Sequence, residues 1–302
     1  MTDERDRADA QDASDDRQRP SREFVQGLER GFSVIRAFSA AAPKLTITDV
    51  SARTGLTRAA ARRYLLTLEE LGYVVRDGTR FILTPRLLDL GYSYLSSTAT
   101  ADIAQPFMER VVERMRESCS LGVLDGADVV VIARVPARRI MSVNVVVGSR
   151  LPAHCTALGK TLLAYLTPEQ LDQYFRVARL ERYTAHTICN EAALRRELRE
   201  AQKRGAAFAN EEAEEGLRTV GVPVYDRTGQ VAASMIVSGH AARVSMKDLR
   251  VRYLPIVREA ARLTSKALGA PVAEPEPAPA ALTLKPRRKP SRAPGTRRGS
   301  HR

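Results

Sequence analysis

Residues 46–72 read TITDVSARTGLTRAAARRYLLTLEELG and contain two helix starts separated by a glycine turn. Thr46 and Asp49 form a capping-box pattern, which predicts a short helix ended by Gly55. Thr57 is a good N-cap for the next helix. The expected buried stripe of that helix is Ala61, Leu65, Leu68 and Leu71. Two helices joined by a tight turn within about 25 residues are typical of a helix-turn-helix unit.

An amphipathic segment precedes this unit, and an expected hairpin follows it. Apolar residues recur at spacings of three and four, a pattern that predicts one buried helix face. Its members are Phe24, Leu28, Phe32, Ile35 and Phe38. After Gly72 apolar residues alternate around Asp77 and Gly78, which favour the primed turn of a tight hairpin. The alternating residues are Tyr73, Val75, Phe81 and Leu83, and this hairpin is interpreted as a wing.

Arginines on the helix after Thr57 and on the hairpin suit contact with double-stranded DNA. A helix in the major groove needs long donors near its N-terminal half, and a wing reaches the DNA backbone or minor groove. The candidate DNA contacts are Thr57, Arg58, Ala59, Arg62, Arg63, Arg76 and Arg80. The alternative is that the arginines only keep an exposed helix soluble, with Thr57 as a cap and Ala59 as a small helix former.

The chain has 302 residues, of which 44% are hydrophobic, and a formal charge of +13. This length is enough for two domains that each bury a core. Residues 271–302 hold two acidic and eight basic side chains among prolines and alanines. This tail and the leader, residues 1–22, have almost no large apolar residues, so both are predicted to be disordered. The tail either adds nonspecific attraction to DNA or is a solvated segment without a role.

The sequence contains neither an apolar run of about 20 residues nor an apolar leader. We therefore expect no membrane segment and no signal peptide, and a cytoplasmic protein. Cys119, Cys155 and Cys189 lie far apart, without a CxxC pair or histidines at ligand spacing. Neither a disulfide framework nor a zinc site follows from them. No metal and no cofactor is expected.

Several segments together resemble the IclR-type transcriptional regulators. Those that match the DNA-binding domain are Gly31–Phe38, Leu45–Val50, Thr54–Thr57 and Tyr64–Tyr73. Two later segments, Leu151–Ala164 and Glu211–Arg218, look like signatures of that family's effector-binding domain. The resemblance covers about residues 24–268. Residues 138–144 and 148–152 look most like the branch that controls aromatic-acid catabolism through the β-ketoadipate route.

The expected fold class is α+β, and the chain is expected to have five parts. They are a disordered leader (1–22), a winged helix-turn-helix DNA-binding domain (23–92), a linker and connecting helix (93–118), an effector-binding domain (119–270) and a disordered basic tail (271–302). The resemblance implies that the effector-binding domain is a GAF-like α/β domain with an antiparallel sheet. Runs of strands with helices set between and after them also indicate an α+β sandwich with an antiparallel sheet.

Apolar runs and turn signals give the expected elements of the effector-binding domain. Strands are expected at 121–124, 129–135, 140–147, 219–224 and 230–238. Helices are expected from about Ala101, with Pro106 in the first turn, from Thr156, over 191–204, and after Ser245, where Asp248 completes a capping box.

A site for a small carboxylate is expected where the chain turns at Pro152 and enters a helix near Thr156. The free amides of the first helical turn converge there at the positive end of the helix dipole. The resemblance implies effector contacts at this helix start, on the central strands and near the acidic stretch. The candidates are Ile140, Val143 and Leu151 as an apolar wall, and His154, Thr156, Ala157, Leu158, Asn210, Thr219 and Ser238.

Most of these residues also have a structural interpretation. The apolar wall can be core, and the hydroxyls of Thr219 and Ser238 can satisfy the backbone. His154 can be a structural hydrogen-bond partner. Arg134 and Arg218 can either neutralise a dicarboxylate or pair with acidic side chains nearby in sequence or space. Those acidic residues are Glu211, Glu212, Glu214 and Glu215.

The expected function is that of a transcription factor and not of an enzyme. We expect it to bind double-stranded operator DNA as a homodimer or tetramer and to respond to a small carboxylate. The resemblance implies an aromatic acid or ring-cleavage product such as protocatechuate, 4-hydroxybenzoate or β-ketoadipate. The helix from about Ala101 is expected to transmit the response.

Two alternatives belong to other functional classes. The first is an architectural DNA-binding protein whose second domain only dimerises. The second is an enzyme with Cys155 as nucleophile and His154 as base. Adjacent residues in a strand or turn point apart, whereas nucleophilic catalysis needs the base within hydrogen-bond reach of the sulfur. The spacing therefore supports the enzyme poorly.

Overall fold

The computed structural model describes residues 23–91, 99–137 and 145–271. Two compact units are present, and the division between them falls between Gly91 and Ala99. The leader, the basic tail, most of the expected linker, and the candidates Ile140 and Val143 lie outside the described residues. Each unit is considered by itself.

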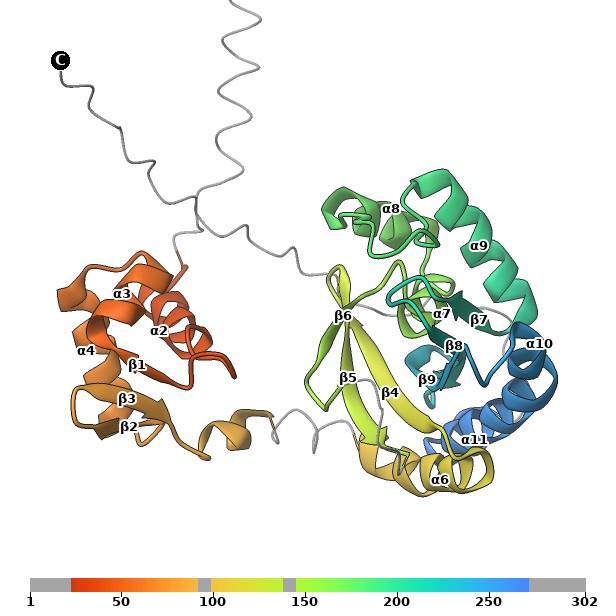
Figure 1. The fold of residues 1–302 in the computed structure, drawn as a ribbon, viewed down its shortest axis with the longest axis horizontal. Helices are drawn as coiled ribbons and strands as arrows, with labels where there is room; N and C mark the ends of the chain where they lie inside the picture. The colour runs from red at the N-terminus through yellow and green to blue at the C-terminus, as the bar shows by residue number, and fades with distance from the viewer. Residues whose placement is uncertain (1–22, 92–98, 138–144, 272–302) are drawn as a thin grey trace, which may run out of the picture. The chain divides into compact units, whose positions relative to one another are not determined.

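The first unit has a core of three helices and a three-stranded sheet, and a further short helical segment begins at residue 87 (Figure 1). Its elements are α2 (Gln26–Arg36), β1 (Lys44–Thr46), α3 (Ile47–Thr54), α4 (Arg58–Glu70), β2 (Val74–Asp77) and β3 (Arg80–Leu83). The sheet order is β1-β3-β2, and both pairings are antiparallel. The predicted helix-turn-helix with its hairpin is confirmed, whereas the three-residue strand β1 was not predicted.

The helix starts follow the capping signals of the sequence. The Asp49 amide donates to Thr46 Oγ1 at 3.2 Å, and the Thr46 amide donates to the Asp49 carboxylate at 2.8 Å. This contact lowers the pKa of Asp49, because the ionised carboxylate accepts the backbone bond. Gly55 ends α3 at φ 73°, a left-handed conformation that glycine adopts without a steric penalty. Both caps are therefore as predicted.

The buried faces of this unit differ from the expected ones in three places. Leu28 and Phe32 of α2 are 62% and 41% exposed, because the three-helix core reaches only the C-terminal half of that helix. Leu71, at the end of α4, is also exposed. In the hairpin, Val74 and not Val75 shares the buried face with Phe81, since the register pairs Val74 with Leu83 and Arg76 with Phe81.

The second unit is built on a six-stranded antiparallel sheet with the order β6-β5-β4-β9-β8-β7. The strands are β4 (Ser118–Asp125), β5 (Asp128–Val135), β6 (Arg150–Pro152), β7 (Ala207–Asn210), β8 (Leu217–Tyr225) and β9 (Val231–His240). Four of them match expected strands, and the predicted antiparallel α+β fold is confirmed. Of the strand expected at 140–147, the described residues 145–147 are not in a strand.

Helices cover both faces of this sheet, which gives three layers (Figure 1). One face carries α6 (Thr100–Met115), α10 (Met246–Asp248), a π-helical turn (Leu249–Tyr253) and α11 (Leu254–Ala267). The other carries α7 (Ala157–Leu163), α8 (Pro168–Val177) and α9 (Glu191–Arg204). The bounds of α9 are those predicted, and Ser245 caps α10 as expected. Neither α8 nor β7 was predicted.

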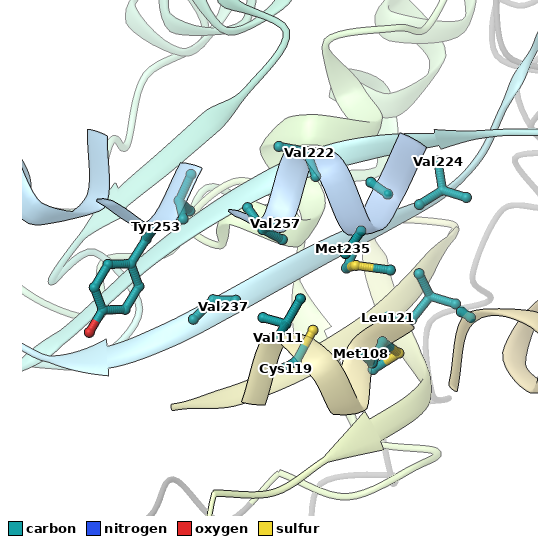
Figure 2. Close-up of a cluster of buried hydrophobic side chains, with 14 of the residues drawn as sticks. Met108, Val111, Cys119, Leu121, Val222, Val224, Met235, Val237, Tyr253 and Val257 are labelled. Carbon is teal, nitrogen blue, oxygen red and sulfur yellow. The ribbon is translucent and has the colours of Figure 1, made fainter. Parts of the chain in front are cut away.

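The helix expected as a connector is part of the core of the second unit. Figure 2 shows Met108 and Val111 of α6 packed against Leu121 of β4 and Met235 of β9. The prediction that Pro106 lies in the first turn is wrong, because α6 begins at Thr100 and Pro106 lies inside the helix. The buried apolar contacts of α6 offset the free-energy cost of the backbone hydrogen bond that is lost at an interior proline.

The opposite layer depends on glycines that let α7 approach the sheet closely. A Cβ at Gly159 would collide with the backbone of Ala153. A Cβ at Gly221 of β8 would lie 2.8 Å from the Ala157 carbonyl oxygen and 2.7 Å from Thr161 Oγ1. The start of α7 is therefore held directly over the strands.

This close approach predicts opposite effects for the same substitution at two helical glycines. Gly159→Ala should destabilise the second unit by about 3 kcal/mol or more, because backbone atoms cannot move away as side chains do. Gly31→Ala in α2, where a Cβ meets nothing within 4 Å, should stabilise its helix by up to about 1 kcal/mol. Hydrogen exchange read by mass spectrometry assigns each change to its unit. Unchanged exchange around α7 in Gly159→Ala would contradict this packing.

Candidate functional site

Three arginines lie on the exposed face of α4. Arg58, Arg62 and Arg63 are all exposed, and all lie in the N-terminal half of the helix. Among residues 23–91 the ion pairs are Lys44–Asp77 and Arg76–Glu69, so none of the three is neutralised within that part of the chain. Arg58 and Arg62 are one turn apart, whereas Arg63 points about 100° further round the helix. This face is therefore positively charged and exposed, as contact with an anionic partner requires.

The two other helix candidates lie beside these arginines at the start of α4. Thr57 accepts from the Ala60 amide at 3.2 Å, so its hydroxyl serves as the N-cap. Ala59 is exposed and carries no polar group. In the free protein, therefore, Thr57 acts as the helix cap that its structural interpretation predicted.

The hairpin arginines differ from each other. Arg76 Nη2 lies 2.8 Å from Glu69 Oε2, and its guanidinium stacks over Phe81 at 5.2 Å from the ring centroid. Arg80 is exposed at the turn. Lys44 of β1 pairs with Asp77 at 2.8 Å and adds a positive charge that sequence reasoning missed. Its hydrogen bond lowers the pKa of Asp77. Two ion pairs thus hold β2 of the wing, one to β1 and one to α4.

The second unit has a hollow of about 510 Å³, open mouth included, between the sheet and the start of α7. Its lining is Ser120, Val131, Arg134, Val145, Leu151, Cys155, Thr156, Ala157, Leu158, Ala209, Ala213, Leu217, Thr219, Ile236 and Ser238. Six sequence candidates meet there: Leu151, Thr156, Ala157, Leu158, Thr219 and Ser238. The lining also contains Ser120, which sequence reasoning missed, and Arg134, which was considered as a partner for a dicarboxylate or for an acidic side chain.

Backbone geometry fixes the helix start at this hollow. Thr156 Oγ1 accepts from the Gly159 amide at 3.1 Å and donates to the Pro152 carbonyl at 3.0 Å. The hydroxyl of Thr156 is therefore used within the protein. The amides of Ala157 and Leu158 belong to the unpaired first turn of a helix.

Two candidates lie outside the lining. Asn210 accepts from Arg218 Nε at 2.7 Å, and Arg218 also pairs with Glu211 at 3.0 Å. This is the acid pairing considered above for Arg218. His154 hydrogen-bonds through Nε2 with the Glu181 carbonyl at 2.9 Å. Both side chains thus have structural partners in the described part of the chain.

A buried ion pair joins α7 to the acidic stretch. Lys160 Nζ lies 2.6 Å from Glu212 Oε1, and both side chains are almost fully buried. Burial raises the pKa of Glu212, because desolvation disfavours the carboxylate, although Lys160 opposes this effect. Removal of either partner would leave a buried charge uncompensated. Lys160 within an apolar run was the sequence signal for this pair.

The enzyme alternative finds little support in the geometry. The Cys155 thiol donates weakly to the Pro152 carbonyl, with 3.9 Å between sulfur and oxygen, whereas His154 is engaged with Glu181. Burial raises the pKa of Cys155 to about 12, which disfavours the nucleophilic thiolate. Within the described residues no group of three or more His, Cys, Asp and Glu is placed to hold a metal.

Models of known protein families match both halves of the chain. The model of the IclR helix-turn-helix domain matches residues 27–78, and that of the bacterial transcriptional regulator IclR C-terminal domain matches residues 92–266. The chain belongs to the IclR family. It is a DNA-binding transcriptional regulator, with DNA binding assigned to the first unit.

Two relatives and one solved structure illustrate its place in the IclR family. The chain is 40% identical to the Pca regulon regulatory protein of Pseudomonas putida, over 80% of this chain and 83% of that protein. It is 34% identical to the p-hydroxybenzoate hydroxylase transcriptional activator of Acinetobacter baylyi, over 79% and 90%. An IclR homolog from Microbacterium hydrocarbonoxydans, solved in complex with 4-hydroxybenzoate, is 27% identical with a TM-score of 0.71, over 80% and 98%.

None of the described helices of this IclR-family chain is long and apolar enough to cross a membrane. The comparisons do not depend on the undescribed residues 1–22 and 272–302, because both family models match between residues 27 and 266. The two units therefore carry the family relationship.

His154 gives the second unit a predictable response to pH. Burial lowers the pKa of His154, so the folded protein binds fewer protons than the unfolded chain just below the ordinary value. Stability should fall as the pH drops below about 6.5, and His154→Gln should flatten this slope. Urea unfolding between about pH 5 and pH 7.5 measures it. Identical slopes for the two proteins would contradict a buried neutral His154.

Proposed function

We propose that this regulator binds operator DNA through α4 and the wing, and that a small carboxylate in the hollow beside α7 controls the binding. The effector class is an aromatic acid or ring-cleavage product, such as protocatechuate, 4-hydroxybenzoate or β-ketoadipate. The observation that carries the effector proposal is the hollow itself, whose described lining is mostly apolar and contains no Asp or Glu. Such a lining favours a small organic anion with an apolar body.

The relatives support the same effector class. A homolog with the same fold has been solved with 4-hydroxybenzoate, and the name of the Acinetobacter relative refers to p-hydroxybenzoate hydroxylase. Leu151, Ala157, Leu158, Thr219 and Ser238 remain the proposed contacts of the effector site. Thr156 supports the helix start, and Asn210 and His154 support the surrounding loops.

The DNA contacts follow from exposure and direction on the helix. We assign base-edge contacts to Arg58 and Arg62, and phosphate contacts to Arg63 and Arg80. Thr57 and Ala59 lie close enough to the helix start to approach the DNA as well. Arg76 is the least available candidate, because Glu69 and Phe81 already hold it.

Regulation requires two states that bind the effector with different affinity, since equal affinity shifts no equilibrium. One three-helix module offers little specific surface, so we propose a homodimer or tetramer that reads half-sites of a pseudo-palindrome. Its site of action would be the cytoplasm, with no catalytic role for Cys155.

The helix assignment predicts a difference between neighbouring arginines. Arg58→Gln or Arg62→Gln should lose about 1 to 3 kcal/mol of discrimination against mutated operators. Arg63→Gln should weaken binding to every sequence and lower the salt slope by about 1. Gel-shift titrations at several salt concentrations measure both quantities. A uniform loss in all three variants would refute base reading by Arg58 and Arg62.

The effector proposal predicts ligand-dependent stability and DNA affinity. An acid present at about 100 times its Kd should stabilise the protein by about 2.7 kcal/mol and change operator affinity. Thermal unfolding and DNA titration with the three acids named above provide the test. If no acid changes either quantity, the second unit is not a sensor of this class, and the architectural alternative gains support.

A further inference from the structure

The hollow beside α7 has an uneven distribution of charge. Among the described residues of its lining, Arg134 is the single side chain with a formal charge. It comes from β5, is half-buried, and donates from Nη1 to Ser120 Oγ at 3.1 Å. Glu211 and Glu212 do not belong to this lining and pair with Arg218 and Lys160. An anion that enters the hollow therefore meets one positive charge and no negative one in this lining.

Strand register gathers the polar groups of the lining on one part of the sheet. Arg134 lies opposite Ser120 in the β4–β5 pair, and Ser120 lies opposite Ile236 of β9. Ser238, two residues beyond Ile236, lies opposite Thr219 of β8. Side chains two residues apart on a strand point to the same face. The guanidinium and three hydroxyls thus form one polar patch, and Leu151, Leu217 and Ile236 supply apolar surface around it.

Arg134 is better suited to hold a carboxylate than the start of α7 is. A helix terminus contributes partial charges, α7 has only seven residues, and Thr156 already caps the Gly159 amide. A guanidinium carries a full charge and presents a planar fork that matches both carboxylate oxygens. Its partial burial weakens the competition from water, which strengthens the interaction with a bound anion.

We propose that Arg134 is the residue that recognises the effector's carboxylate and thereby selects carboxylates over neutral analogues. Ser120 orients the guanidinium, and Ser238 and Thr219 complete the polar patch. The apolar body of the effector lies against Leu151, Leu217 and Ile236. This assignment rests on the proposed effector site, and it moves the anion contact from the helix start to β5.

The test compares an acid with its neutral isostere on the full chain. The probes are 4-hydroxybenzoate and 4-hydroxybenzamide, and protocatechuate and its carboxamide, titrated by calorimetry. The variants are Arg134→Gln and Arg134→Lys. Arg150→Gln is the matched control, because Arg150 lies on the adjacent strand β6 beside Leu151 but is engaged at the surface by Asp125 and Asp128. Operator affinity without ligand reports whether each variant is folded.

The expected result is a loss that depends on the charge of the ligand. Arg134→Gln should weaken acid binding about 10- to 100-fold, as loss of a charge-assisted pair does, and leave the carboxamides within about twofold. Arg134→Lys should recover part of the acid affinity, and Arg150→Gln should match the wild type.

Other results overturn the assignment. Equal losses for acid and carboxamide would reduce Arg134 to a structural role, and full acid affinity in Arg134→Gln would remove it from recognition. In both cases the proposed function survives, because the wild type still binds the acid. If the wild type binds neither of these acids nor β-ketoadipate, the proposed function fails and Arg134 has no carboxylate to recognise.

Discussion

The structure of the second unit depends on the close approach of α7 to the sheet. Gly159 lies against the backbone of Ala153, and Gly221 lies beneath Ala157 and Thr161. Because backbone contacts of this kind leave no room for a methyl group, the helix start has one position over β4, β8 and β9. That position creates the hollow, aligns Leu158 with Gly122, and brings Lys160 to Glu212. The shape of the site is thus a consequence of packing at small residues, and the polar residues lie on the surface that this packing creates.

Local signals in the sequence were sufficient for most elements and insufficient for long-range partners. Thr46 with Asp49, Thr57, Thr156 and Ser245 start helices where their capping patterns indicate, since a cap depends on residues within one turn. Thr167 and Gln170 form the same box at α8, so that helix was detectable but overlooked. By contrast, β1 and β7 have three and four residues and form only because longer strands, β3 and β8, offer a free edge.

From local patterns the candidate site was predictable only where it lies on one continuous segment, whereas Thr219 and Ser238 were expected from the family resemblance. Leu151, Thr156, Ala157 and Leu158 come from a single stretch and reach the hollow together. Arg134, Ser120 and Ser238 come from three strands, and their meeting depends on register and on the bulge between Leu121 and Gly122. The pairing of polar side chains also decides which residues belong to the site. Arg218 binds Glu211 and Asn210, and Lys160 binds Glu212. No spacing rule along the chain distinguishes these partners.

The central strands connect the hollow to the opposite layer. On β4, Ser120 faces the hollow, whereas Cys119 and Leu121 face the core that contains Met108 and Val111 (Figure 2). On β9, Ile236 and Ser238 line the hollow, and Met235 and Val237 face the same core. A strand cannot shift on one face without moving the side chains of the other, because both belong to one backbone with a period of two. Because α6 is the first helix after the division between the units and packs in this core, the proposed effector contacts on β4 and β9 would also act on the layer that contains α6.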